Sequence, residues 1–180
     1  MGRASSRRCT RIDIAPLDSA QTIFFRRDSL YAFRHGKLAG AQPFVHPLMV
    51  LGFDAYFDPP AVTAAKLQAL HFDLSKVHEE SWQGRPAIVV GPLAGDTTST
   101  QFWVDRERLV FVRMIEPATG GRPGTAETRF NQYQALGKGW LSVEVTFGVG
   151  GVLQQKETYA DPRADVELPE TLFDPARYGA

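Results

Sequence analysis

The fold is decided by the stretch Gln101-Phe102-Trp103-Val104-Asp105-Arg106-Glu107-Arg108-Leu109-Val110-Phe111-Val112-Arg113-Met114. It predicts two β-strands joined by a charged turn at 105–108, because β-branched and aromatic residues are typical of strands. Side chains alternate between the two faces of a strand. On the second strand, one face would carry Leu109 and Phe111, and the other Val110, Val112 and Met114. An ordinary antiparallel strand keeps one polar face, so this hairpin must be covered on both sides or must border an apolar cavity.

Strand patterns of the same kind recur along the chain in hairpin order. Turn residues such as Gly, Asp and Ser separate them, and strands do not alternate with helices as they do in a parallel sheet. Besides the hairpin and a short strand at 11–14, the predicted strands are 22–27, 30–34, 37–42, 76–83, 86–90, 125–134, 140–148 and 152–159. A long antiparallel meander curls because its strands twist. We therefore expect a curved sheet with a concave inner face.

Two consecutive helices are predicted between the strands, at 47–57 and 58–70. The first begins at Pro47, which suits the first turn of a helix, and its residues are apolar almost all round. The second has Asp58 as its candidate N-cap. The predicted fold is therefore mainly β (α+β): a strongly curved, unclosed antiparallel sheet, or half-barrel, with two helices against its concave face.

Composition predicts one globular domain at 15–180, preceded by a basic and mobile N-terminal tail at 1–14. The 180 residues are 43% hydrophobic and 22% charged, as is usual for globular proteins. The formal net charge is zero, so no nucleic-acid partner is expected, even beside the arginines that surround Trp103 and Phe111. The arginines of the tail are Arg3, Arg7, Arg8 and Arg11.

No pattern of catalytic or metal-binding residues stands out. Cys9 has no second cysteine to pair with, and although its basic neighbours could lower its pKa, it has no oriented base. His71 and His78 lie near three acids, but without the spacing of a zinc-binding helix. Glu79 and Glu80 are adjacent on a predicted strand, so they point to opposite faces. We expect no catalytic residue, no metal and no cofactor.

Seven short phrases in the chain resemble the LolA/LolB-like family of outer-membrane lipoprotein-sorting proteins, over most of the chain from about residue 22. They are Trp82-Gln83-Gly84-Arg85, Phe102-Trp103-Val104-Asp105, Val112-Arg113-Met114, Phe130-Asn131-Gln132-Tyr133, Gly139-Trp140, Tyr159-Ala160-Asp161 and Leu172-Phe173-Asp174-Pro175. The resemblance implies an apolar cavity that holds acyl chains, a membrane-associated partner and no catalytic machinery. Two features depart from the family: no helix precedes the first strand, and no export signal is visible.

The compartment depends on that resemblance. As written, the chain has neither an export signal nor an apolar run of about 20 residues that could span a membrane, and it would be cytoplasmic. If the family assignment holds and the start of the gene lies upstream, the protein would be periplasmic or in the cell envelope.

The candidate pocket is apolar and combines the first predicted helix with the hairpin. Its residues are Leu48, Met49, Leu51, Phe53, Tyr56, Phe57, Trp103, Leu109 and Phe111. The same residues fit an ordinary core, since hydrophobic runs usually pack inside. The function predicted is non-catalytic binding of a lipid or lipoprotein acyl chain, or a similar apolar ligand, in envelope transport.

Two other functions stay open on the residues alone. One is a small-molecule enzyme on the same scaffold, which a polar cluster converging inside the cavity would favour. The other is a protein-interaction or sensor module, which an exposed sheet edge or a large apolar patch would favour.

Overall fold

The structure, a computed structural model, describes residues 9–178. It confirms a mainly β fold of unclosed antiparallel sheet with two α-helices. The strands are divided between two sheets, whereas the sequence predicted one. The chain divides into two compact units, the first comprising Met1–Val50 with Val166–Ala180 and the second Leu51–Asp165. The tail arginines Arg3, Arg7 and Arg8 lie outside the described residues, whereas 9–14, also assigned to the tail, form a strand. The single domain at 15–180 stays a prediction.

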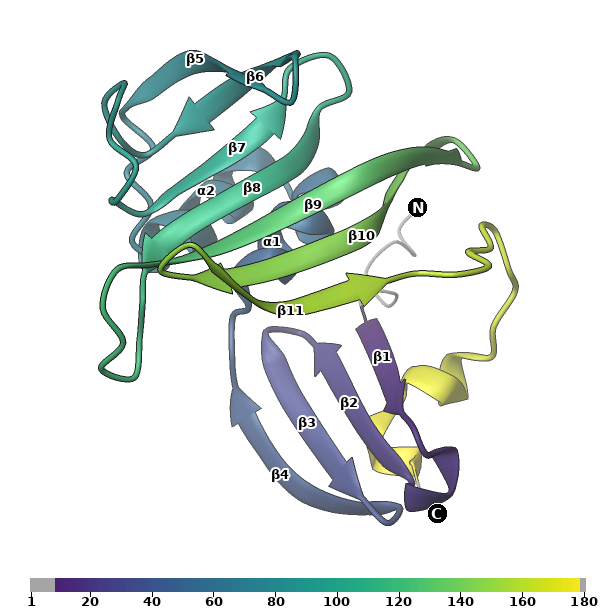
Figure 1. The fold of residues 1–180 in the computed structure, drawn as a ribbon. Helices are drawn as coiled ribbons and strands as arrows, with labels where there is room; N and C mark the ends of the chain where they lie inside the picture. The colour runs from purple at the N-terminus through teal and green to yellow at the C-terminus, as the bar shows by residue number, and fades with distance from the viewer. Residues whose placement is uncertain (1–8, 179–180) are drawn as a thin grey trace. The chain divides into compact units, whose positions relative to one another are not determined.

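The first unit is built on a four-stranded sheet in the order β1-β2-β3-β4. Its elements, labelled in Figure 1 where space allows, are β1 (Cys9–Ile14), η1 (Leu17–Ser19), β2 (Gln21–Arg26), β3 (Ser29–Arg34), β4 (Lys37–Pro43), η3 (Glu170–Phe173) and η4 (Pro175–Arg177). Phe24 is fully buried, and its ring packs edge-to-face against Phe33 and Tyr178 with centroids 5.6 and 5.5 Å away. The C-terminal segment therefore completes the core of this unit.

The second unit is built on a seven-stranded antiparallel sheet in the order β11-β10-β9-β8-β7-β6-β5. Its strands are β5 (Val77–Trp82), β6 (Arg85–Val90), β7 (Gln101–Asp105), β8 (Val110–Pro117), β9 (Thr125–Leu136), β10 (Gly139–Val149) and β11 (Val152–Thr158). The helices are α1 (Pro47–Gly52), which crosses the unit boundary, η2 (Asp54–Tyr56) and α2 (Pro60–Ala69). Both predicted helical stretches are thus present.

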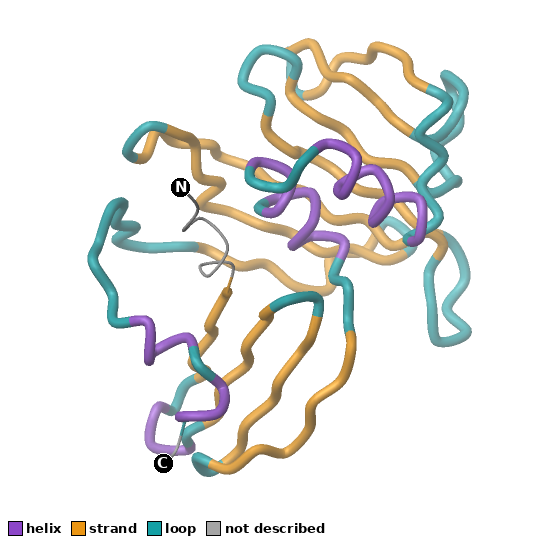
Figure 2. The backbone as a smooth tube through the Cα atoms, turned by 180° about the vertical axis from the view of Figure 1, so that it is seen from behind, coloured by secondary structure: helices purple, strands orange, loops and turns teal. Residues whose placement is uncertain are grey.

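The helical segment from the end of α1 to Phe72 lies on the concave face of this sheet, as Figures 1 and 2 show from opposite sides. Phe72, just after α2, packs edge-to-face on Phe102 of β7, with ring centroids 5.3 Å apart. Phe111 of β8 packs on Phe130 of β9 at 4.9 Å, and Gly52 at the end of α1 lies against the Phe130 ring. Phe111 is 1% exposed, a burial that stabilises the fold by roughly 1.5–3 kcal/mol.

A β-bulge changes which hairpin side chains share a face. The β7–β8 ladder shifts register after Trp103, and Val112 has no partner in it. Val112 and Arg113 both lie on the Trp103 side of the sheet, whereas Met114 pairs with Phe102 on the helix side. The prediction that Val112 and Met114 share a face is therefore wrong, because a bulge places two neighbours on one side.

Leu109 does not lie in a strand, contrary to the prediction. It ends the hairpin turn with φ 54° and a side chain that is 62% exposed, and β8 begins at Val110. Hairpin loops of several residues often end with one residue in the left-handed conformation, which re-aims the chain into the next strand. Leu109 therefore does not share the face of Phe111.

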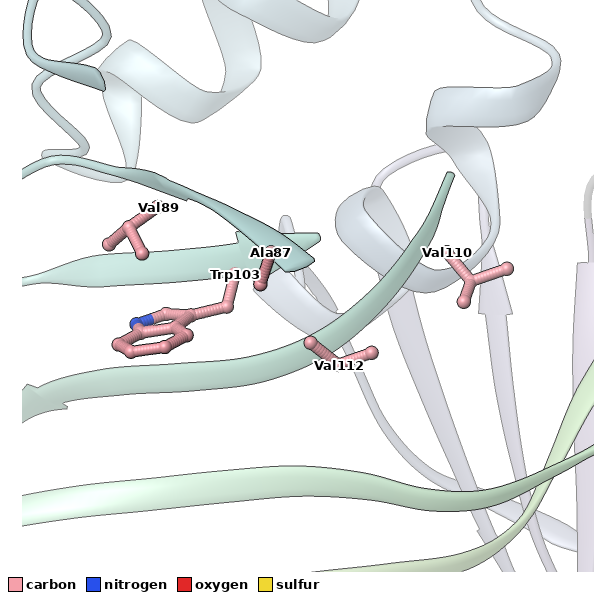
Figure 3. Packing of buried hydrophobic residues seen from close by; sticks show 5 residues of the cluster. All are labelled: Ala87, Val89, Trp103, Val110 and Val112. Atoms are coloured by element: carbon pink, nitrogen blue, oxygen red, sulfur yellow. The ribbon is translucent and has the colours of Figure 1, made fainter. Parts of the chain in front are cut away.

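The face of the sheet away from the helices carries its own hydrophobic cluster. Figure 3 shows its members, none more than 8% exposed: Ala87, Val89, Trp103, Val110 and Val112. Trp82 and Tyr133 pack against this cluster. Trp103 donates its indole N–H to the side chain of buried Gln101 at 2.8 Å, so its polar atom is satisfied. The hairpin is thus covered on both sides.

Asp105 organises the turn of the hairpin. Its side chain is 6% exposed and accepts the backbone N–H groups of Glu107 and Arg108 at 3.0 and 2.9 Å. Arg85 of β6 donates to the same carboxylate at 2.5 Å, and this hydrogen bond holds the pKa of Asp105 below its ordinary value. The charged turn is therefore fixed by a buried carboxylate.

We predict that Asp105→Ala lowers the free energy of unfolding by about 2–3 kcal/mol, because Arg85 and two turn N–H groups lose their acceptor. Urea unfolding at pH 7 measures the loss. A carboxylate with a depressed folded pKa contributes fully above its unfolded pKa of about 3.9. The contribution disappears as the pH falls through the folded pKa, so the difference from wild type shrinks in acid.

Glu107→Ala is the matched control for that prediction. Glu107 also contacts Arg85, at 2.7 Å, but its side chain is 61% exposed. Its removal should cost at most about 0.5 kcal/mol, as is usual for exposed ion pairs. Equal losses in the two variants would show that burial of the Asp105 carboxylate does not matter.

Candidate functional site

The structure gathers five of the nine candidate pocket residues on one side of the second unit. Leu51, Phe53, Tyr56 and Phe57 lie in or beside the helical segment, and Phe111 lies on the sheet face that this segment covers. The other four lie elsewhere. Leu48 and Met49 belong to the first unit, Trp103 lies on the opposite face of the sheet, and Leu109 lies in the turn. That these residues line a pocket stays a prediction.

The β-ladder is open where the helical segment meets the sheet. Strands β8 and β9 pair from Arg113 onward, and Phe111 lies before the start of that ladder. Two tyrosines replace the missing strand partner: the Phe111 N–H donates to the Tyr56 hydroxyl at 3.4 Å, and Tyr133 donates its O–H to the Phe111 carbonyl. The backbone polar groups of Phe111 are satisfied by side chains from two directions, as buried backbone requires.

Both tyrosines stay protonated over the usual pH range. Burial raises the pKa of Tyr56 and raises that of Tyr133 still further. A protonated phenol can donate or accept a hydrogen bond, but it is not a base. These tyrosines therefore hold the strand and supply no acid–base pair.

Aromatic side chains of the helical segment keep much of their surface exposed. Phe53, Tyr56 and Phe57 are 43, 50 and 71% exposed, whereas Leu51 beside them is 5% exposed. The segment therefore buries part of its apolar surface on the sheet and presents the remainder outward. Contiguous exposed apolar side chains are typical of ligand or partner contacts, unlike single ones.

Charged side chains tie the helical segment together. Lys66 of α2 places its Nζ atom 3.4 Å from carboxylate oxygens of both Asp54 and Asp58, and all three side chains are at most 20% exposed. The cation is thus shared between η2 and the start of α2. The cluster links these two elements and contains no nucleophile with an oriented base.

Cys9, His71 and His78 lie in three different elements of the structure. Cys9 lies in β1 with its Sγ atom 3.6 Å from the Phe173 carbonyl, and burial raises its thiol pKa, opposite to the lowering that its basic neighbours suggested. His71 lies in the turn after α2 and His78 in β5. Within the described range 9–178, no three His, Cys, Asp or Glu side chains gather in a manner that could hold a metal ion.

Sequence reasoning missed an arginine that packs against two tryptophans, Trp82 and Trp103, whose rings also contact one another edge-to-face at 5.8 Å. The Arg113 guanidinium lies 4.9 Å from the Trp82 ring centroid and 4.8 Å from that of Trp103. Glu127 of β9 binds Arg113 at 2.5 Å and Arg129 at 2.7 Å. Together with Glu127, Arg113 and the two tryptophans join β5, β7, β8 and β9 across one face of the sheet. The bulge at Val112 places Arg113 on the same face of the sheet as Trp103. No pattern in the sequence predicts this bulge.

The fold and the site together describe a curved antiparallel sheet whose concave face is covered by an aromatic helical segment. Comparison of the chain with protein-family models, curated proteins and solved structures finds no match. The resemblance to the LolA/LolB-like family therefore stays a prediction. In the part of the chain that the structure describes, no helix combines the length and the apolar character needed to cross a membrane.

We predict that Tyr133→Phe lowers the free energy of unfolding by about 1–2 kcal/mol, because it leaves the Phe111 carbonyl without its donor. Tyr56→Phe should cost no more than about 0.5 kcal/mol, since its hydrogen bond is long and water can reach a half-exposed residue. Urea unfolding of both variants measures the contrast. The reverse order of losses would mean that Tyr56, and not Tyr133, holds the open ladder.

Proposed function

We propose that the second unit binds a lipid acyl chain, or a similar apolar molecule, between its helical segment and the concave sheet face, without catalysis. The observation that carries the proposal is the division of the segment into a packed and an exposed part. Leu51 is buried, whereas Phe53, Tyr56 and Phe57 are 43–71% exposed over an apolar sheet face. A segment packed in this way can exchange its own contacts for those of a ligand.

The polar anchoring of the segment to the sheet supports the same proposal. Tyr56 reaches Phe111 through a hydrogen bond of 3.4 Å, longer than the usual range. When it breaks, the Phe111 N–H needs water or a polar ligand atom as its acceptor, whereas the Phe111 carbonyl keeps its separate bond from Tyr133. Beneath the segment lie the buried side chains of Phe102, Phe111 and Met114, which carry no hydrogen-bonding group and suit contact with an acyl chain.

The cellular role that we propose follows from the family resemblance. A LolA/LolB-like protein that holds an acyl chain would carry lipid or lipoprotein within the cell envelope and would meet a membrane-associated partner. The aromatic side chains of Phe53 and Phe57 would then be the first to contact the acyl chain, because they are already at the surface.

We predict that the purified protein carries lipid, which organic-solvent extraction followed by mass spectrometry detects. Delipidated protein should then bind a fluorescent fatty acid saturably. The double variant Phe53→Ser/Phe57→Ser should weaken this binding about 10-fold or more, the equivalent of roughly 1.4 kcal/mol. Its free energy of unfolding should change by less than about 1 kcal/mol, because Phe53 and Phe57 are already 43 and 71% exposed in the folded protein.

Leu93→Ser is the matched control for the double variant. Leu93 lies in the loop before β7 of the same unit and is 70% exposed, so it tests removal of an exposed apolar side chain elsewhere. Unchanged affinity is expected. Absence of both co-purified lipid and saturable binding would refute the proposal, as would an equal loss of affinity in Leu93→Ser.

A further inference from the structure

The turn between β2 and β3 differs from comparable turns in the described chain. Four two-residue hairpin turns there have positive φ at both central positions: 27–28, 35–36, 83–84 and 150–151. Glycine occupies the second position in the last three. In the first, Arg27 and Asp28 have φ of 51° and 55°, and no glycine is present. The residue that stands in place of glycine is Asp28, and aspartate tolerates a positive φ better than most side chains. Arg27 has the same backbone conformation as His35 and Gln83 in the other turns.

Arg27 borders a surface depression of about 280 Å³ within the first unit. The β2–β3 hairpin and η4 provide its walls, through Arg26, Arg27, Tyr31, Asp174, Pro175 and Ala176. The turn that presents Arg27 is fixed on both sides. The Phe44 N–H donates to the Asp28 carbonyl at 2.8 Å, and the Ser29 hydroxyl donates to the Arg27 carbonyl at 3.4 Å.

The depression is lined by two arginines and one aspartate, so one positive charge is not compensated by another lining residue. Arg26 donates to the carbonyl of Phe173 at 3.1 Å and to the Asp174 carboxylate at 3.2 Å. Asp174 also accepts the Ala176 N–H at 3.2 Å and lies 3.6 Å from Nε of Arg177, so its negative charge is compensated. Arg26 and Asp174 therefore neutralise one another in the wall of the site.

Arg27 and Tyr31 are the donors that remain. Neither the Arg27 guanidinium nor the Tyr31 hydroxyl makes a hydrogen bond or an ion pair within residues 9–178. Pro175 and Ala176 add a small apolar wall beside them. The depression thus offers a forked cation, a hydroxyl donor and an apolar surface, which is the chemistry that recognises a phosphate ester.

We propose that this depression binds the phosphate group of a small phosphate ester or of a phospholipid headgroup, with Arg27 and Tyr31 as its donors. The planar guanidinium matches two phosphate oxygens, and the hydrogen-bonded turn places Arg27 beside the depression before a ligand binds. A volume of about 280 Å³ admits a headgroup-sized molecule but not a whole lipid. The proposal does not rest on acyl-chain binding, because every residue of this site lies in the first unit.

Titration of the full chain with inorganic phosphate and with glycerol 3-phosphate, at constant ionic strength, tests the site. Arginine side-chain and backbone NMR signals should shift saturably at residues 26–31 and 174–176. Arg27→Asn should weaken binding at least 10-fold. It should also raise the Tm by about 2 °C, since asparagine tolerates positive φ in such turns. Tyr31→Phe should weaken binding 2- to 5-fold.

Arg34→Ala is the matched control. It removes the same charge from an exposed arginine at the other end of β3, and less than a 2-fold change is expected. A second arm compares co-sedimentation with vesicles of phosphatidylglycerol and of phosphatidylcholine. Binding to the former that Arg27→Asn abolishes assigns the phosphate to a lipid headgroup, and binding of the soluble phosphates alone assigns it to a free ester. Unchanged binding in Arg27→Asn, an equal loss in Arg34→Ala, or no binding of any probe overturns the proposal.

Discussion

Shielding of the β7–β8 hairpin from water on both faces is the constraint on which the second unit depends. Phe102 and Phe111 face the helical segment, and Trp103 faces the cluster on the other side. A strand pair that is apolar on both faces cannot lie at a wet surface, so it needs a sheet wide enough to flank it and a cover for each face. The helices provide one cover. Trp82, Arg113 and Trp103, which pack against one another, provide the other with their neighbours.

The two covers differ in how they are held. The outer cover is crosslinked by Glu127, which binds Arg113, and by the buried hydrogen bond from Trp103 to Gln101. Such satisfied polar contacts hold these side chains in one arrangement, because breaking any of them leaves a buried charge or donor without a partner. The helical cover touches the sheet mainly through apolar contacts, which are non-directional and can be replaced by other apolar surface. Any exchange with a ligand therefore belongs on the helical side.

The sequence predicted elements well because their patterns are local. Alternating apolar residues and the turn residues between them predict the strands, and the apolar run that begins at Pro47 predicts the helical region. Faces were harder. The bulge after Trp103 moves Val112 to the side of Arg113, and the left-handed Leu109 starts β8 one residue later than expected. Both depend on backbone geometry that composition does not encode. The predicted pocket consequently combines residues from both faces, because Trp103 and Phe111 lie on opposite sides of the sheet.

The distribution of exposed apolar side chains distinguishes the helical segment from the remainder of its unit. Of the other exposed apolar residues, Leu93 and Leu109 lie singly in a loop and a turn, and Val152 and Leu153 are neighbours in the edge strand β11, where successive side chains point to opposite faces. Such scattered exposure is normal, since polar residues cannot cover a whole surface. Phe53 and Phe57 differ because they are close in sequence and flank η2, directly after buried Leu51. A stretch selected only for packing would turn its aromatic residues inward, so their exposure favours contact with an apolar ligand over a purely structural role.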